Sequence, residues 1–341
     1  MTYPWQENLK RELLGNQAGL SHALLLHGQA GIGKRGFAEE LARDLLCEHP
    51  ADNGSACGRC VACGWLAAGT HPDFQLLQPD SETAGDTPSE EAVAEKGKKQ
   101  IQITIAQVRE LINAVNLSSS RGGRRVILIH PAEAMNVSAA NALLKTLEEP
   151  QSNTLFILVS HQMQRLPATV RSRCLKIAMP MPTRQQSLDW LAGQGMEHPE
   201  ISLAQAGNAP LRALDLTSGG YPEKRAAFLA RLGEAQDMDP LALAETSEKL
   251  ELAWVLNWLQ TWVYDLAAAK TSGSIRFHLD FSDKIMHLAK HVDLVRLFDY
   301  QHDLLSAQKA LHHPLNTRLL LEQLLLTYWQ VMNRKQEPAR V

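Results

Sequence analysis

Short apolar runs alternate with amphipathic stretches over the first half of the chain. Leu, Ile, Val and Phe dominate residues 23–26, 126–129 and 154–160, and residues 74–77 form a fourth, weaker run. Apolar runs of this length without alternation are typical of strands that are buried on both faces, as in a parallel sheet. We therefore predict four strands in this half of the chain.

Helices are predicted between these strands. Apolar side chains recur at helical spacing after the first strand, and Thr104 and Gln107 form a capping box before a second amphipathic stretch. A third helix, over residues 139–149, must end before Pro150. Strands that alternate with helices predict a doubly wound α/β domain, in which helices flank a parallel sheet and the ligand lies at the carboxyl ends of the strands.

The pattern changes at residues 179–182, which read Met-Pro-Met-Pro. Two prolines two positions apart can neither continue a helix nor pair in the centre of a sheet, so we place a domain boundary here. We expect an α/β domain over residues 1–180, a small helical domain over residues 181–220 and a larger all-helical domain over residues 221–341. A Gly-Gly turn separates the last two.

A loop of phosphate-binding type follows the first strand and reads GQAGIGKR. It fits the pattern G-x-x-x-x-G-K-[ST], in which backbone N–H groups surround phosphates, a Lys reaches the outer phosphates and a hydroxyl holds Mg²⁺. Gly28, Gly31, Gly33 and Lys34 are therefore candidate nucleotide-binding residues. Arg35 stands where the hydroxyl belongs, and a guanidinium has no lone pair for a metal.

A second nucleotide motif is also incomplete. The strand over residues 126–129 should be followed by an Asp for Mg²⁺ and a Glu that activates water, but the chain reads His130-Pro131, and Glu133 is displaced along the chain. Together with Arg35 these are three defects in one mechanism, because phosphoryl transfer depends on the metal and on positioning. We expect no Mg²⁺ and no hydrolysis at this loop, while ATP binding stays open.

Four cysteines, Cys47, Cys57, Cys60 and Cys63, lie close together in the sequence. Four thiolates complete a tetrahedral Zn²⁺ site and leave no position for water, so such a site is structural. An iron–sulfur cluster and buried cysteines without a metal are the alternatives. We predict structural zinc held by an insert over residues 47–63.

Composition narrows the class of function. The 341 residues include 34 basic and 37 acidic side chains, and the net charge of −3 opposes a free-standing DNA-binding module built on the zinc site. Neither a leader-like start nor a run of about 18 apolar residues is present, so we expect a soluble, cytoplasmic protein. Residues 80–100 contain no aromatic residue, and we expect a mobile insertion there.

Three further segments resemble a known family. They read GTHPD at residues 69–73, NVSAANALLKTLEEP at residues 136–150 and RSRC at residues 171–174, and they resemble the clamp-loader AAA+ proteins of bacteria. A four-cysteine insert in the first domain belongs to the same pattern. The resemblance implies an AAA+ domain, a helical lid and a C-terminal domain that assembles into a collar.

The resemblance also implies a catalytic role for Arg173. In this family the arginine of the Ser-Arg-Cys segment enters the ATP site of the neighbouring subunit and acts as an arginine finger in trans. A planar guanidinium that is always charged is suited to stabilise the charge that develops on a γ-phosphate. Ser172 and Cys174 would hold its loop, and a surface arginine without such a role is the alternative.

Three other positions match the family less specifically. Lys145 would face the chamber through which DNA passes, with a solvated helix face as the alternative. Ser160 lies where the family senses the γ-phosphate, and Arg212 lies near a second sensor. If nucleotide binding has been lost, both are structural residues.

Our first hypothesis is a component of the DNA polymerase III clamp loader without intrinsic ATPase activity. The resemblance implies assembly with tau/gamma and delta subunits, and contact with the sliding clamp and primer-template DNA through the complex that loads the clamp. An active, tau/gamma-like ATPase is the alternative; residues 28–34 favour it, while Arg35, His130 and Pro131 oppose it. A zinc-stabilised DNA-binding module is the further alternative.

Overall fold

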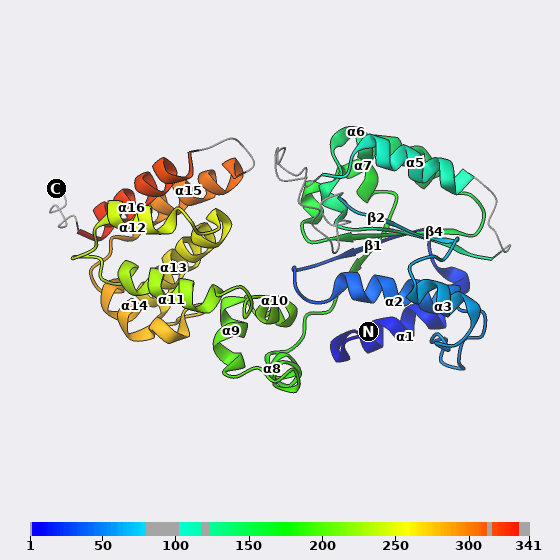
Figure 1. Cartoon of the computed structure of the whole chain (residues 1–341), viewed down its shortest axis with the longest axis horizontal. Coiled ribbons are helices and arrows are strands. Elements are labelled where there is room, and N and C mark those ends of the chain that lie inside the picture. The colour runs from blue at the N-terminus through cyan, green and yellow to red at the C-terminus, as the bar shows by residue number, and fades with distance from the viewer. Residues whose placement is uncertain (1, 80–101, 117–122, 312–315, 334–341) are drawn as a thin grey trace, which may run out of the picture. The chain divides into compact units, whose positions relative to one another are not determined.

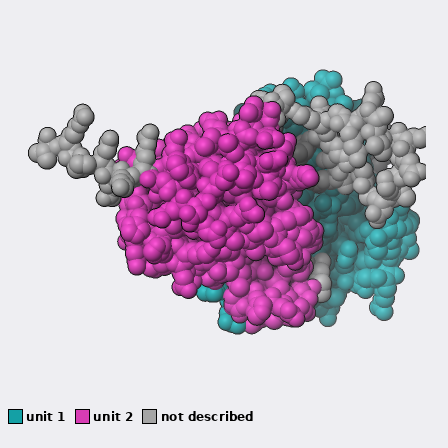
Figure 2. All heavy atoms as spheres, turned by 60° about the vertical axis from the view of Figure 1, so that its left-hand side comes forward, with its two compact units in different colours: residues 1–186 teal, residues 187–341 magenta. Residues whose placement is uncertain are grey.

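The structure, a computed structural model, describes residues 2–79, 102–116, 123–311 and 316–333. The chain divides into two compact units, Met1–Gln186 and Ser187–Val341 (Figure 1, Figure 2). The insertion expected at residues 80–100 lies outside the described residues, so its mobility stays a prediction.

A five-stranded parallel sheet forms the centre of the first unit, within the residues that the structure describes (Figure 1). The strand order is β2-β3-β4-β1-β5. The strands are β1 (Ala23–His27), β2 (Phe74–Leu77), β3 (Arg125–Ile129), β4 (Thr154–Ser160) and β5 (Leu175–Ala178). The predicted α/β architecture and the four predicted strands are confirmed, and all the strand pairs are parallel.

Helices cover both faces of this sheet. Helices α5 (Ile105–Asn116) and α6 (Val137–Glu148) lie on one face, and α2 (Lys34–Leu46) lies on the other (Figure 1). Every residue of β3 and β4 is buried, because these central strands have helices on both sides. Each fully buried Leu, Ile or Val side chain contributes about 1.5–3 kcal/mol relative to exposure to water. The described residues of this unit also include the α-helices α1 (Glu7–Gly15), α3 (Val61–Ala67) and α7 (Ala168–Arg171).

Strand β5 was not predicted from the sequence. It pairs with β1 alone and lies at the edge of the sheet, where Leu175 is 49% exposed. An edge strand needs no continuous apolar run, because one side of it faces solvent. The sequence Leu-Lys-Ile-Ala therefore lacks the signal that identified the buried strands.

Side chains cap the N-termini of helices α5 and α6, which lie on the same face of the sheet. The capping box before α5 is confirmed: the backbone N–H of Thr104 donates to Gln107 Oε1 at 2.8 Å, and the N–H of Gln107 donates to Thr104 Oγ1 at 3.4 Å. Asn136 caps α6 by accepting from the N–H of Ala139 at 2.8 Å. Helix α6 therefore begins at Val137, two residues before the predicted start.

The second unit is helical over its described residues. Its helices are α8 (Arg184–Gly193), which begins at the unit boundary, α9 (Pro199–Gln205), α10 (Pro210–Asp215), α11 (Tyr221–Leu232), α12 (Pro240–Ser247), α13 (Leu252–Ser272), α14 (Ser282–Ala289), α15 (Leu294–Ala310) and α16 (Thr317–Asn333). A small cluster around Leu191 and Leu203 is separate from a large one around Trp258 and Trp262. The predicted boundaries at residues 180 and 220 stay predictions. None of the helices in the described ranges is long and apolar enough to span a membrane.

Candidate functional site

Three glycines of the loop at residues 28–35 have positive φ angles. Gly28, Gly31 and Gly33 have φ angles of 148°, 78° and 88°, and Gly33 is the N-cap of α2. The side chain of Lys34, however, turns back onto the loop: its Nζ donates to the backbone oxygens of Gly28 at 2.7 Å and Gln29 at 2.5 Å. Burial lowers the pKa of Lys34 to about 8, although Glu133 opposes the shift.

The N-terminal segment lies against this loop. The indole Nε1 of Trp5 and the amide Nε2 of Gln6 donate to the backbone oxygen of Ile32 at 3.0 and 2.9 Å. The ring of Tyr3 stacks on that of Trp5 with centroids 5.0 Å apart, and a Cβ added at Gly33 would lie 2.4 Å from the Tyr3 ring. The Tyr3 ring therefore fills the space that a side chain at position 33 would need, so only glycine fits there.

The ends of β3 and β4 place two imidazoles beside the loop. His130 and His161 meet edge to face with ring centroids 5.4 Å apart, and Glu133 Oε1 accepts from the backbone N–H of His161 at 2.9 Å. Burial, His161 and the cations Arg35 and Lys34 lower the pKa of His130 to about 4. Where the sequence pattern calls for two carboxylates, the structure thus has a buried imidazole that prefers its neutral form.

Arg35, the residue in the place of the hydroxyl, lies in the first turn of α2. Its Nε donates to Glu39 Oε1 at 2.9 Å, one helical turn later. A guanidinium offers hydrogen-bond donors only, so this position provides no ligand for a metal ion.

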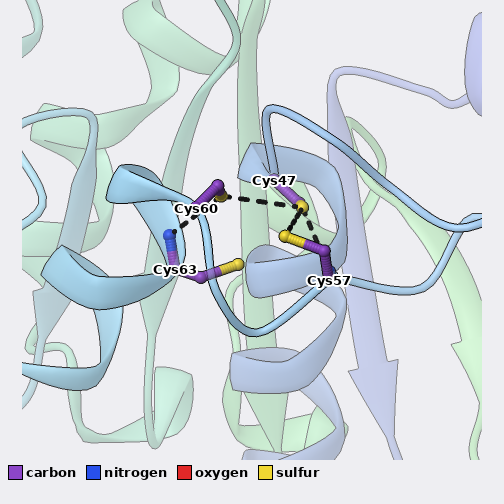
Figure 3. Close-up of side chains that lie close together, drawn as sticks. All are labelled: Cys47, Cys57, Cys60 and Cys63. Atoms are coloured by element: carbon purple, nitrogen blue, oxygen red, sulfur yellow. Dashed lines mark hydrogen bonds between the residues drawn. The ribbon is translucent and has the colours of Figure 1, made fainter.

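The four cysteines converge, although they come from separate segments (Figure 3). Cys47 is the C-cap of α2, Cys60 is the N-cap of α3, and Cys63 lies in the first turn of α3. All four Sγ atoms lie within 4.8 Å of one another, and Cys47 Sγ is 3.6 Å from Cys57 Sγ and 3.9 Å from Cys60 Sγ. A Zn–S distance of about 2.3 Å in a tetrahedron places the sulfurs about 3.8 Å apart. The cluster therefore fits a single metal ion.

Backbone N–H groups also support this cluster. The N–H of Cys57 donates to Cys47 Sγ at 3.2 Å, and the N–H of Cys63 donates to Cys60 Sγ at 3.4 Å. Burial raises the pKa of Cys47, and it raises that of Cys63 to about 12. At Cys60, the N–H of Cys63 and the neighbouring thiols outweigh burial and lower the pKa to about 7. Such bonds favour the thiolate, which is the form that binds metals.

Arg173 lies two residues after the end of the short helix α7, next to the buried Cys174. Its side chain is 31% exposed, whereas Val170 and Cys174 are buried in the hydrophobic core of the first unit. Its Nε donates to Glu148 Oε1 at 2.8 Å, its Nη2 donates to the same oxygen, and its Nη1 donates to the backbone oxygen of Thr169 at 2.8 Å. The hydroxyl of Ser172 also donates to the Thr169 oxygen, at 3.0 Å.

The three less specific positions have different surroundings. Ser160 ends β4, is fully buried, and its Oγ accepts from the N–H of Gln162 at 3.2 Å. Arg212 lies in the second unit, where its Nη2 donates to Asn257 Oδ1 at 3.3 Å. Lys145 is exposed in the last turn of α6. The functional assignments of all three stay predictions.

Several contacts at these sites were not anticipated from the sequence. The Tyr3 and Trp5 contacts with the loop span about 30 positions, and Glu148 and Arg173 lie 25 positions apart. No local pattern encodes such pairs, because they depend on how the elements pack. For the contact of Tyr3 and Trp5 with the loop, the one available signal was the presence of two aromatic residues in a short polar segment.

Comparison with known proteins identifies the family. The family model described as DNA polymerase III, delta subunit matches residues 5–183, and the one described as its C terminal matches residues 221–330. DNA polymerase III subunit delta' of Pseudomonas aeruginosa is 39% identical over 96% of this chain and 97% of the relative. The chain belongs to the delta-prime family of DNA polymerase III subunits. The family member from Escherichia coli is 31% identical over 95% of this chain and 94% of its own length.

A solved structure of a DNA polymerase III gamma subunit-related protein from Thermotoga maritima is also similar to this chain. It is 16% identical, with 97% of this chain and 100% of that chain covered and a TM-score of 0.42. A likeness of this size supports no argument about function. Membership of the delta-prime family rests on the sequence relatives, and it confirms the resemblance to clamp-loader proteins.

Proposed function

We propose that the chain is a clamp-loader subunit that hydrolyses no ATP itself and supplies Arg173 as an arginine finger to the ATP site of a neighbouring tau/gamma subunit. In this proposal it assembles with tau/gamma and delta subunits into the complex that loads the sliding clamp onto primed DNA. The observation on which the proposal chiefly depends is a partly exposed Arg173 guanidinium, set on buried neighbours in a chain of the delta-prime family.

Three features near α2 support the absence of hydrolysis. Arg35 offers no lone pair for Mg²⁺, and His130 and Pro131 provide no carboxylate. Lys34 is bonded to carbonyl oxygens of its own loop instead of reaching outward. A nucleotide would have to compete with these bonds for the Lys34 ammonium group.

The chemistry of Arg173 supports its role in trans. Guanidinium is always charged and binds phosphate oxygens through N–H groups in a fixed plane, which Lys cannot do. Arginine fingers in related phosphoryl-transfer systems contribute about 10³–10⁵ to the rate.

For the four-cysteine cluster we propose a structural zinc ion. Four thiolates close the coordination sphere, so the ion has no position for substrate and serves the fold. We prefer zinc to an iron–sulfur cluster because a single ion fits the sulfur separations of 3.6 and 3.9 Å.

The test is ATP turnover by the reconstituted clamp loader. Part of the ATP turnover of the complex depends on the presence of this subunit, and Arg173→Ala should lower that part by about 10³-fold. Arg173→Lys should restore little of it, because lysine lacks the planar arrangement of donors. Arg165→Ala, which removes an exposed arginine from the same region, is the matched control and should leave turnover unchanged. If the part of ATP turnover that depends on this subunit is unchanged in Arg173→Ala, the proposal is refuted.

The isolated chain provides the second arm of this test. Purified alone, it should show no ATP turnover at any Mg²⁺ concentration. Turnover by the isolated chain that is lost on Lys34→Ala would favour the active, tau/gamma-like ATPase instead.

A further inference from the structure

Glu148 is the side chain that fixes the orientation of Arg173. It is the last residue of α6, and its Oε1 accepts from both Nε and Nη2 of Arg173. The backbone oxygen of Thr169 accepts from Nη1 at 2.8 Å. Two anchors on different segments, α6 and α7, therefore hold one guanidinium from two directions.

The contacts leave part of the guanidinium available. An arginine side chain has five N–H groups: one on Nε and two on each terminal nitrogen. Three of them are used in the bonds to Glu148 and Thr169, so Nη1 and Nη2 each keep one N–H outside these contacts. Two N–H groups on adjacent nitrogens match the oxygens of a phosphate.

Both partners of this ion pair stand on rigid supports. Leu147, next to Glu148, is 1% exposed, and Val170 near Arg173 is fully buried in the same hydrophobic cluster. The charged ends themselves remain accessible, with exposed fractions of 31% for the Arg173 side chain and 49% for that of Glu148. An ion pair this exposed adds little to stability, so its main effect is on geometry.

We infer that Glu148 is a positioning residue, which holds the Arg173 side chain in the conformation that presents its remaining N–H groups to the phosphate of the neighbouring subunit. The inference rests on the proposed function of Arg173. Without the carboxylate, the long arginine side chain samples several rotamers and must be ordered anew in each catalytic cycle. The loss should therefore appear in the rate of the chemical step and not in the binding of ATP.

The experiment measures kcat and KM for ATP in the reconstituted clamp loader with substituted chains. Glu148→Ala should lower kcat by about tenfold and leave KM unchanged. Glu148→Gln keeps an oxygen that accepts from Nε and Nη2, so it should retain more of the rate than Glu148→Ala. Glu149→Gln alters the neighbouring exposed carboxylate, which makes no bond to Arg173 among the described contacts, and should behave as the unsubstituted chain.

A double-substituted chain separates this inference from the proposed function. If Glu148 acts through Arg173, adding Glu148→Ala to Arg173→Ala should cause no further loss. A full rate or a raised rate in Glu148→Ala, or a loss that persists in the Arg173→Ala background, would overturn the positioning role while the arginine finger stands. An Arg173→Ala complex with unchanged kcat would overturn both. Thermal unfolding of each chain checks that the substitutions leave the fold intact.

Discussion

The two ends of helix α2 differ in how completely they keep the side chains of a known kind of site: a phosphate-binding loop at the N-terminal end and a cysteine cluster at the C-terminal end. At the N-terminal end, Gly33 keeps the left-handed backbone of the loop, but Arg35 replaces the hydroxyl and Lys34 bonds to its own loop. At the C-terminal end, Cys47 meets three other thiols, and the ligand set is complete.

The difference reflects how each kind of site fails. A nucleotide site takes its hydroxyl and carboxylates from separate segments, and losing one of them leaves the surrounding backbone intact. In the proposed zinc site, the metal would join the end of α2 to the start of α3, so the loss of one thiolate ligand should release both the ion and the segment. On the functions proposed above, the N-terminal end of α2 supports no ATP hydrolysis, whereas its C-terminal end depends on all four thiol ligands.

Disruption of the metal end should have the largest effect on stability. Cys60→Ser keeps an oxygen that can cap α3, so any loss reports on metal binding and not on the cap. The free energy of unfolding should fall by at least about 3 kcal/mol, and the metal content should fall from one ion per chain to none. Denaturant unfolding and elemental analysis measure these two quantities.

Cys174→Ala is the control for the metal prediction. This cysteine is buried in the hydrophobic core of the first unit and lies outside the cluster. The variant should keep one metal ion per chain even if packing is weakened. Equal metal content in Cys60→Ser and Cys174→Ala would contradict a four-thiolate site.

Acid should lower the free energy of unfolding through His130, which lies near the N-terminal end of α2. Its pKa is about 4 in the folded chain against an ordinary value of 6.5, so the unfolded chain takes up the proton first as pH falls. The stability that neutral His130 contributes is complete above pH 6.5 and is lost as pH falls toward 4. Between pH 7 and pH 5 this amounts to about 1–2 kcal/mol.

His130→Gln tests this prediction, because glutamine is neutral at both pH values. Denaturant unfolding at pH 7 and pH 5 should give a smaller difference for the variant than for the unsubstituted chain. Parallel stability curves for the two proteins would mean that His130 has the same pKa in the folded and unfolded chains, and would contradict the lowered pKa.

The smallest effect is expected from the lysine of the phosphate loop. In a working loop this side chain is essential, but here it contacts only Gly28 and Gln29 among its described hydrogen bonds. Lys34→Met keeps the apolar stem, and ATP turnover by the reconstituted clamp loader should stay within about twofold. A loss larger than tenfold would show that the loop of this subunit still takes part in catalysis and would remove the contrast between the two ends of α2.

Local sequence patterns predicted the features that depend on neighbouring residues and missed those that depend on distant ones. The buried strands β3 and β4 and the Thr104–Gln107 capping box depend on a few neighbouring residues, and each is present as predicted. Strand β5 was missed because an exposed edge carries no apolar run. The Tyr3 ring beside Gly33 was missed because it comes from another segment.

The sequence by itself determined the chemical groups: four thiols, a loop without its hydroxyl, a strand end without carboxylates, and an arginine in a family motif. Only the tertiary structure decided which of these groups meet. The thiols gather because the end of α2 lies beside the start of α3, and Glu148 reaches Arg173 because α6 packs against α7. The physical reason is that local patterns set the helices and strands, whereas contacts between distant residues follow from packing in a sheet whose strand order, β2-β3-β4-β1-β5, is not the order of the chain.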